Sequence, residues 1–182
     1  MGAEARELEK LKWQCCLGYA TMDILQGPIT LAFGRYNKRT LDPVQTKLLN
    51  ESILENGLQN LVAANAIPIV VSEGEITSQR LVDDPTAQES IPDMPWKAEV
   101  MGVKKVVVAP GGNHRRQALF DFVKPLRKRL QQAETRLARL SNQDRRWPKL
   151  FGECEIARKD LQRSSRWLVA VYSEGGIRSF SS

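Results

Sequence analysis

The sequence has few of the residues that build metal sites and catalytic triads. Among 182 residues there is one histidine, His114, and there are three cysteines: Cys15, Cys16 and Cys154. The cysteine count is odd and no Cys-x-x-Cys pair exists, which argues against a disulfide framework and against a zinc site. Any catalytic arrangement that needs an imidazole must therefore use His114.

Long apolar runs are also missing. No segment approaches the roughly 20 apolar residues that a membrane-spanning helix needs. The first residues, Met1 to Lys12, are polar and charged, unlike a secretory signal. We therefore expect an intracellular protein, in the cytoplasm or the nucleus, that has no membrane partner. The oligomeric state is left open.

Charge is divided unevenly along the chain. Residues 1–100 carry 9 Lys or Arg and 14 Asp or Glu, whereas residues 101–182 carry 18 and 7. A basic half can bind a polyanion by neutralising phosphates, or it can simply be solvated or pack on the acidic half. The basic residues expected to contact nucleic acid are Arg127, Lys128, Arg129, Arg136 and Arg139.

Local patterns predict a mixed α/β (α+β) protein with a small sheet, flanking helices, a C-terminal helical hairpin and a final strand. Apolar residues at helical spacing in residues 3–16 predict a helix, so residues 1–26 are expected to form an N-terminal helical extension. Residues 27–182 are expected to form the main domain. Strands are predicted at 29–33, 67–71, 103–109 and 167–172. Pro68 indicates that the second strand begins there or lies at an edge of the sheet.

A helix is predicted to follow Asp42. Aspartate is a good N-cap and proline suits the first helical position, where Pro43 stands. Gly57 predicts the end of this helix. Its apolar face is expected to consist of Val44, Leu48, Leu49, Ile53 and Leu54.

Residues 72–99 differ from their surroundings. They are acidic, contain three prolines and show little periodicity, so they are expected to form a long surface insertion. Such a loop is a surface elaboration without a function (an ornament), a lid or a partner-binding segment.

The C-terminal third is predicted to contain a basic helical segment, residues 125–166. A helix from Asn113 is expected to end at Lys124, and a second helix to begin near Pro125. A return helix is expected at Gly152–Arg163, with Ile156 and Leu161 facing inward. The tail after Gly175 is small and polar and is expected to be frayed. The seam of the hairpin, in steps of four and three, is Leu119, Val123, Leu126, Leu130, Ala133, Leu137 and Leu140.

The most specific local pattern is a strand, a Gly111-Gly112 turn and then a helix. Two glycines allow a tight turn and the close approach of an anion. The N-terminus of a helix exposes unpaired N–H groups and a partial positive charge. His114, Arg115 and Arg116 follow in its first turn, where cations oppose the helix dipole unless an anion binds. The pattern predicts a phosphate site; the alternative is a plain turn with solvated basic residues.

The run from Val107 to Leu119 resembles the second motif of the ParB/sulfiredoxin superfamily, which has glycine, a basic pair and a small residue at a helix start. The run from Glu51 to Gln59, after Leu41-Asp42-Pro43, resembles the first ParB-type motif. Arg39 stands where the family often has an arginine. Together the two motifs cover residues 29–71 and 103–123. The resemblance implies a ParB/sulfiredoxin-like fold for residues 27–182.

The resemblance also implies a set of phosphate- or nucleotide-binding residues: Gly111, Gly112, Asn113, His114, Arg115 and Arg116, with Arg39 and Ser52. Some positions depart from the family. Gln45 and Leu48 replace a lysine and a serine of sulfiredoxin, and Asn113 replaces its reactive cysteine. Without that thiol the redox repair reaction of sulfiredoxin is not expected. Residues 125–182 contain no clear DNA-reading helix, so centromere partitioning is not expected either.

Three functions remain compatible with the sequence. The first is a ParB-like nuclease in which His114 is the general acid or base, Arg39 and Arg115 stabilise charge, and Glu55 positions water or Mg²⁺. The second is an ATP- or CTP-binding NTPase, switch or small-molecule kinase that uses Mg²⁺. The third is a non-catalytic module that binds DNA or protein, in which His114 is structural.

Overall fold

The protein is described here by a computed structural model that covers residues 15–26, 28–34, 40–87 and 90–178. It is a mixed α/β protein, as the sequence predicts. The described residues form two compact units. The sheet unit draws on the described residues within Met1–Thr40, Gln59–Asn113 and Trp167–Ser182, and the helical unit consists of Leu41–Leu58 and His114–Arg166.

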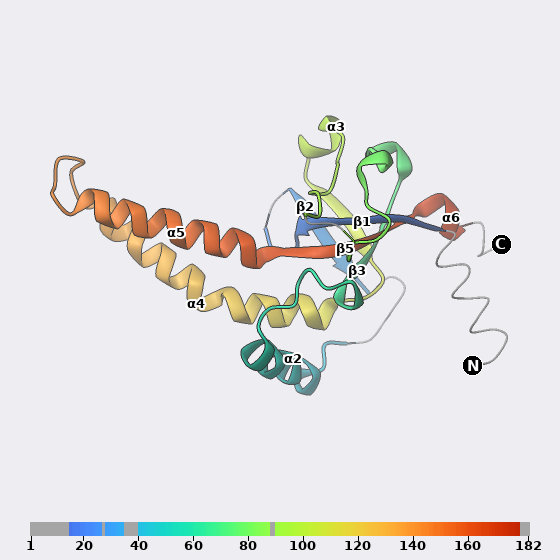
Figure 1. The fold of residues 1–182 in the computed structure, drawn as a ribbon, viewed down its shortest axis with the longest axis horizontal. Helices are drawn as coiled ribbons and strands as arrows, with labels where there is room; N and C mark the ends of the chain where they lie inside the picture. Colours follow the sequence, from blue (N-terminus) through green and yellow to red (C-terminus); the bar gives the residue numbers. More distant parts are fainter. Residues whose placement is uncertain (1–14, 27, 35–39, 88–89, 179–182) are drawn as a thin grey trace. The chain divides into compact units, whose positions relative to one another are not determined.

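The sheet unit is built on five strands in the order β1-β5-β3-β4-β2 (Figure 1). β3 runs parallel to β5 and antiparallel to β4, and β4 runs parallel to β2. Valine and isoleucine dominate the inner strands, and Ile67, Ile69, Val107 and Val169 are at most 2% exposed. The strands are β1 (Cys16–Asp23), β2 (Ile29–Phe33), β3 (Ile67–Val71), β4 (Lys105–Ala109) and β5 (Arg166–Ser173).

The prediction of a helical extension over residues 1–26 is wrong where the structure tests it, because Cys16–Asp23 form the strand β1. Residues 1–14 lie outside the described part. Gly18 has a φ of 129°, and a Cβ there would lie 2.9 Å from the Cβ of Leu81. β1 is therefore stabilised by close contact with the distant segment around Leu81. The spacing of apolar residues within residues 3–16 carries no information about such a contact.

The predicted strand at 67–71 is confirmed, but the alternative that placed it at an edge is wrong, because β3 is the middle strand. Pro68 lies opposite Ala170 of β5, and the residue of β3 paired with β4 is Val70, opposite Val108. Pro68, which has no backbone N–H, thus lies near the start of β3, two residues before Val70, where β3 pairs with β4.

Residues 72–99 are anchored to β1 rather than forming an unstructured insertion. The backbones of Tyr19 and Val82 exchange two hydrogen bonds of 2.8 and 3.0 Å. Thr21 donates to the carbonyl of Pro92 and accepts from the N–H of Met94. An edge strand exposes unpaired backbone groups, and this segment covers those of β1. It also contains the short helices η2 (Glu73–Glu75) and η3 (Ser78–Arg80), and α3 (Ala98–Met101) follows.

In the helical unit, α2 (Pro43–Asn56) has the predicted ends. Asp42 is the N-cap and accepts a 2.8 Å hydrogen bond from the N–H of Val44, and Gly57 follows the helix with a φ of 76°. The predicted apolar face is only partly correct. Thr46 is buried and Leu49 and Ile53 are half-buried, but three members of that face are exposed: Val44, Leu48 and Leu54.

The predicted break at Lys124-Pro125 is wrong, because α4 continues from Asn113 to Leu137. Proline removes the N–H that would bond to the carbonyl of Asp121. Both Asp121 and Pro125 are exposed, so water can bond to that carbonyl, which lowers the cost of the missing hydrogen bond.

The helical hairpin is confirmed, with α5 (Trp147–Ser165) lying beside α4 (Figure 1). Arg158 of α5 donates to Glu134 of α4 at 2.7 Å, and Leu161 is buried as predicted. Ile156 is 62% exposed, so its predicted inward position is wrong. Every residue of the predicted seam on α4 is buried or half-buried. Within the tail that was predicted to fray, Glu174–Arg178 form a short helix, α6, and residues 179–182 lie outside the described part.

Candidate phosphate-binding turn and basic helical surface

The predicted turn joins β4 to α4. β4 ends at Ala109 and α4 begins at Asn113, as the sequence predicts. Gly112 has a φ of 94°, and a Cβ there would lie 2.8 Å from Cγ1 of Ile67. At Gly111 a Cβ would make an ordinary 3.7 Å contact with Pro68. Gly112 is therefore required by the fold itself, whereas Gly111 is not.

His114 is placed as a hydrogen-bond acceptor. Its Nε2 accepts a 2.8 Å bond from the backbone N–H of Asp42, the N-cap of α2. A neutral imidazole with an accepting Nε2 carries its proton on Nδ1, and a doubly protonated ring could not accept this bond. His114 thus ties the first turn of α4 to the start of α2, which supports a structural role.

Replacement of His114 tests this role. We expect His114→Ala to lower the free energy of unfolding by about 1 kcal/mol, because the N–H of Asp42 loses its acceptor. His114→Gln should recover most of this loss, since its side-chain carbonyl can accept the same bond. Urea denaturation followed by circular dichroism measures both variants, and equal losses would contradict the assignment.

Arg115 lies half-buried one residue further along α4, and burial lowers the pKa of its guanidinium. Within the described part of the chain it forms no hydrogen bond and no ion pair. A partly desolvated cation without a counter-charge is costly, and an anion at this position would offset that cost. Arg116 is half-buried and engaged in other interactions.

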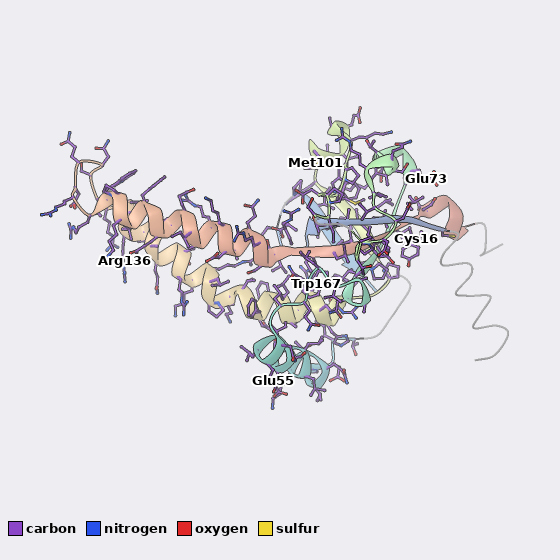
Figure 2. The ribbon with its side chains drawn as sticks, viewed as in Figure 1. Cys16, Glu55, Glu73, Met101, Arg136 and Trp167 are labelled. Atoms are coloured by element: carbon purple, nitrogen blue, oxygen red, sulfur yellow. The ribbon has the colours of Figure 1, made fainter. Side chains whose placement is uncertain are left out.

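Two further predicted site residues lie elsewhere on the helical unit. Ser52 and Glu55 are exposed on α2, and Glu55 lies on the side opposite the buried Thr46. Figure 2 shows Glu55 on the side of α2 that faces away from α4. His114 contacts the backbone N–H of Asp42, and Ser52 lies ten residues further on, about 15 Å along α2, so this contact does not bring Ser52 or Glu55 to the turn. Arg39 lies outside the described residues.

The basic residues predicted to contact nucleic acid divide into two groups. Lys128, Arg129 and Arg136 are exposed on α4, Arg139 is exposed in the turn after it, and Figure 2 shows Arg136 near the closed end of the hairpin. Arg127 is different. Its guanidinium carbon lies 5.5 Å from the ring centre of Phe120, and its Nε and Nη2 are buried without a hydrogen-bond partner. The placement of Arg127 therefore does not support a contact with nucleic acid through Nε or Nη2, and the contact stays a prediction.

The closed end of the hairpin combines aromatic and charged residues. Trp147 stacks on Phe151 with ring centres 4.8 Å apart and an interplanar angle of 11°. Arg146 donates to both carboxylate oxygens of Asp144, and this pairing lowers the pKa of Asp144 to about 2. Trp167, in contrast, is a core residue, because it is 4% exposed and its Nε1–H donates to the carbonyl of Asn65.

A cavity of about 400 Å³ lies between α2 and α4, and the sequence analysis did not find it. α2 contributes Asn50 and Leu54, and the other lining residues are Asp121, Phe122, Pro125, Leu126 and Arg129 of α4. The spacing of Asp121, Pro125 and Arg129 by four residues is a signal in the sequence that places them along one side of a helix. That signal is visible only if the helix is read as continuous through Pro125.

No described helix is both long enough and apolar enough to cross a membrane. In the part of the chain that the structure describes, no three His, Cys, Asp or Glu side chains are grouped so that they could hold a metal ion. Comparison of the chain with protein-family models, curated proteins and solved structures finds no match.

Proposed function

We propose that the protein is a ParB/sulfiredoxin-like phosphate-binding protein that acts on nucleic acid, with the phosphate held at the N-terminus of α4. The binding residues in this proposal are Gly111, Gly112, Asn113 and Arg115. Two motifs support the assignment to the superfamily, and they occur in the family's order along the chain. Support also comes from the strand, glycine turn and helix, which have the bounds that the second motif requires.

Arg115 is the observation that carries the proposal. It is half-buried in the first turn of a 25-residue helix, and no acidic side chain among the described residues pairs with it. Cations at this end of a helix are destabilised by the helix dipole. A phosphate there would accept hydrogen bonds from the free backbone N–H groups and from the guanidinium at the same time.

Binding is better supported than hydrolysis. Nε2 of His114 is occupied by the N–H of Asp42, and Glu55 lies on the exposed side of α2. A general acid or base and a carboxylate that positions water or Mg²⁺ would have to meet at one phosphate. The proposal is therefore restricted to phosphate recognition, with nucleic acid preferred because of the exposed basic residues on α4.

Arg115→Ala tests the proposal. We expect this variant to bind a fluorescently labelled oligonucleotide roughly 10- to 100-fold more weakly, because one charge-assisted contact is lost. Lys124→Ala is the matched control, since it removes the same charge from an exposed position on the same helix. Fluorescence anisotropy measures the oligonucleotide, and calorimetry with ATP and CTP, with and without Mg²⁺, measures nucleotides. Equal effects of the two variants would contradict the phosphate site.

A further inference from the structure

The cavity between α2 and α4 has apolar walls and a polar rim. Leu54 of α2 and Phe122, Pro125 and Leu126 of α4 form the walls. Its volume of about 400 Å³ falls in the range of roughly 300–1,000 Å³ that is usual for small-ligand sites. Leu54 is 78% exposed, so one wall of the cavity is an apolar side chain that solvent reaches freely. This lining therefore favours a ligand with an apolar surface.

The rim residues define which polar groups such a ligand needs. Asp121 receives one hydrogen bond, of 3.1 Å, from Nε2 of Gln117, which orients the carboxylate and leaves it further acceptor capacity. The backbone carbonyl of Asp121 also lacks a helical donor, because Pro125 has no N–H. Asn50 adds a side-chain amide from α2. Two acceptors on one residue favour a ligand that offers an amino group.

Charge continues from the cavity along α4. Arg129 lines the cavity, Arg136 follows two turns later near the same side of α4, and Arg139 lies in the turn after the helix. All three are exposed, and none has an ion-pair partner among the described residues. Arg129 and Arg136 are separated by about 10 Å along the helix axis. These arginines therefore favour a ligand whose remaining part, outside the cavity, is an anionic chain rather than an apolar peptide.

We propose that the cavity binds an unstacked base that carries an exocyclic amino group, and that the protein's preferred ligand is single-stranded nucleic acid. Phe122 and Leu54 contact the faces of the base, Asp121 accepts from its amino group, and Arg129 contacts the adjoining phosphate. This inference rests on the proposed function, because it names the kind of nucleic acid that reaches the phosphate-binding turn. In a duplex, the base faces are stacked and the amino groups are paired, so neither can enter this cavity.

The experiment compares four labelled 12-mers by anisotropy at mildly alkaline pH: oligo(dC), oligo(dT), a strand of abasic sites and a duplex. Abasic sites keep the phosphates and remove the bases. We expect the abasic strand to bind at least roughly 5-fold more weakly than oligo(dT), because contacts to base faces are lost. Oligo(dC) should bind at least roughly 5-fold more tightly than oligo(dT), because thymine has no amino group. The duplex should bind more weakly than either single strand with bases.

Two variants tie these preferences to the cavity. Asp121→Ala should remove the preference for oligo(dC) over oligo(dT). Leu54→Ala should weaken binding of oligo(dT) and leave the abasic strand unchanged. Leu48→Ala, at another exposed leucine of α2 outside the cavity, is the matched control and should change neither ligand. Circular dichroism of each variant verifies that the fold is intact.

The outcomes separate the two proposals. If the abasic strand binds as tightly as oligo(dT), the cavity is not a base site, and an apolar side chain of a protein partner becomes its better occupant. Equal binding of duplex and single strands also overturns the inference, while the phosphate-binding turn survives if Arg115→Ala still weakens binding. If no polymer binds the wild-type protein, both the proposed function and this inference fail.

Discussion

Gly112→Ala is expected to lower the free energy of unfolding by about 3 kcal/mol. The φ of 94° at Gly112 lies in a region that costs an L-residue about 1–2 kcal/mol. The added Cβ would also lie 2.8 Å from Cγ1 and 3.0 Å from Cγ2 of Ile67. Ile67 is fully buried in β3 and cannot move away without disturbing the sheet, and such overpacking typically costs about 1–3 kcal/mol.

Gly111→Ala is the matched control for this prediction. It adds the same methyl group one residue earlier, where the nearest atom is Cγ of Pro68 at 3.7 Å and the φ is not in the left-handed region. We expect this variant to change the free energy of unfolding by less than about 1 kcal/mol. Urea denaturation of both variants, followed by circular dichroism, gives the comparison. Equal destabilisation at both positions would contradict the packing argument.

The strands and helix ends that depend on local sequence could be predicted. Asp42 and Pro43 start α2, and Gly57 ends it, because capping and backbone preferences act within a few residues. β3, β4 and β5 are short apolar segments with many β-branched residues, which favour strands. In these elements local preference and tertiary structure agree.

The elements that the sequence missed depend on distant contacts. β1 contains Gly18 and Ala20, which have little strand preference, and it is stabilised by hydrogen bonds to Val82 and Met94 far along the chain. The continuity of α4 through Pro125 depends on which side of the helix faces solvent. The secondary-structure propensity of a residue says nothing about which strand it pairs with or which side of a helix is exposed. The pairing decided the structure of β1, and the exposure decided the continuity of α4.

The site was predictable only as a backbone pattern. The glycine turn and the start of α4 have the predicted bounds, because a strand, two glycines and a helix are specified locally. The roles of side chains were not predictable in the same way. Arg127, Lys128 and Arg129 are adjacent in sequence, but successive helical residues point about 100° apart. Packing on Phe120 leaves Arg127 half-buried, whereas Lys128 and Arg129 are exposed.

The exposed basic residues Arg136, on α4, and Arg139, in the turn after it, lead to the second large expected effect. We expect the double variant Arg136→Ala/Arg139→Ala to bind single-stranded oligonucleotides roughly 25-fold more weakly at 0.1 M salt. Each phosphate contact on a single strand contributes about −0.7 to the slope of log K against log salt, which is about 5-fold in affinity at that salt concentration. The slope itself should become less steep by about 1.4 for the loss of two contacts.

Lys149→Ala/Lys159→Ala is the matched control, because it removes the same charge from exposed positions on α5, the other helix of the hairpin. If the whole basic half acted only through its net charge, the two double variants would weaken binding and flatten the salt dependence equally. If Arg136 and Arg139 belong to the nucleic-acid surface, the control keeps the wild-type slope, and only the Arg136→Ala/Arg139→Ala variant changes it. Anisotropy titrations from low to high salt distinguish these results. A steep, unchanged slope for the Arg136→Ala/Arg139→Ala variant would remove these two residues from the binding site and leave the turn at Gly112 as the remaining candidate.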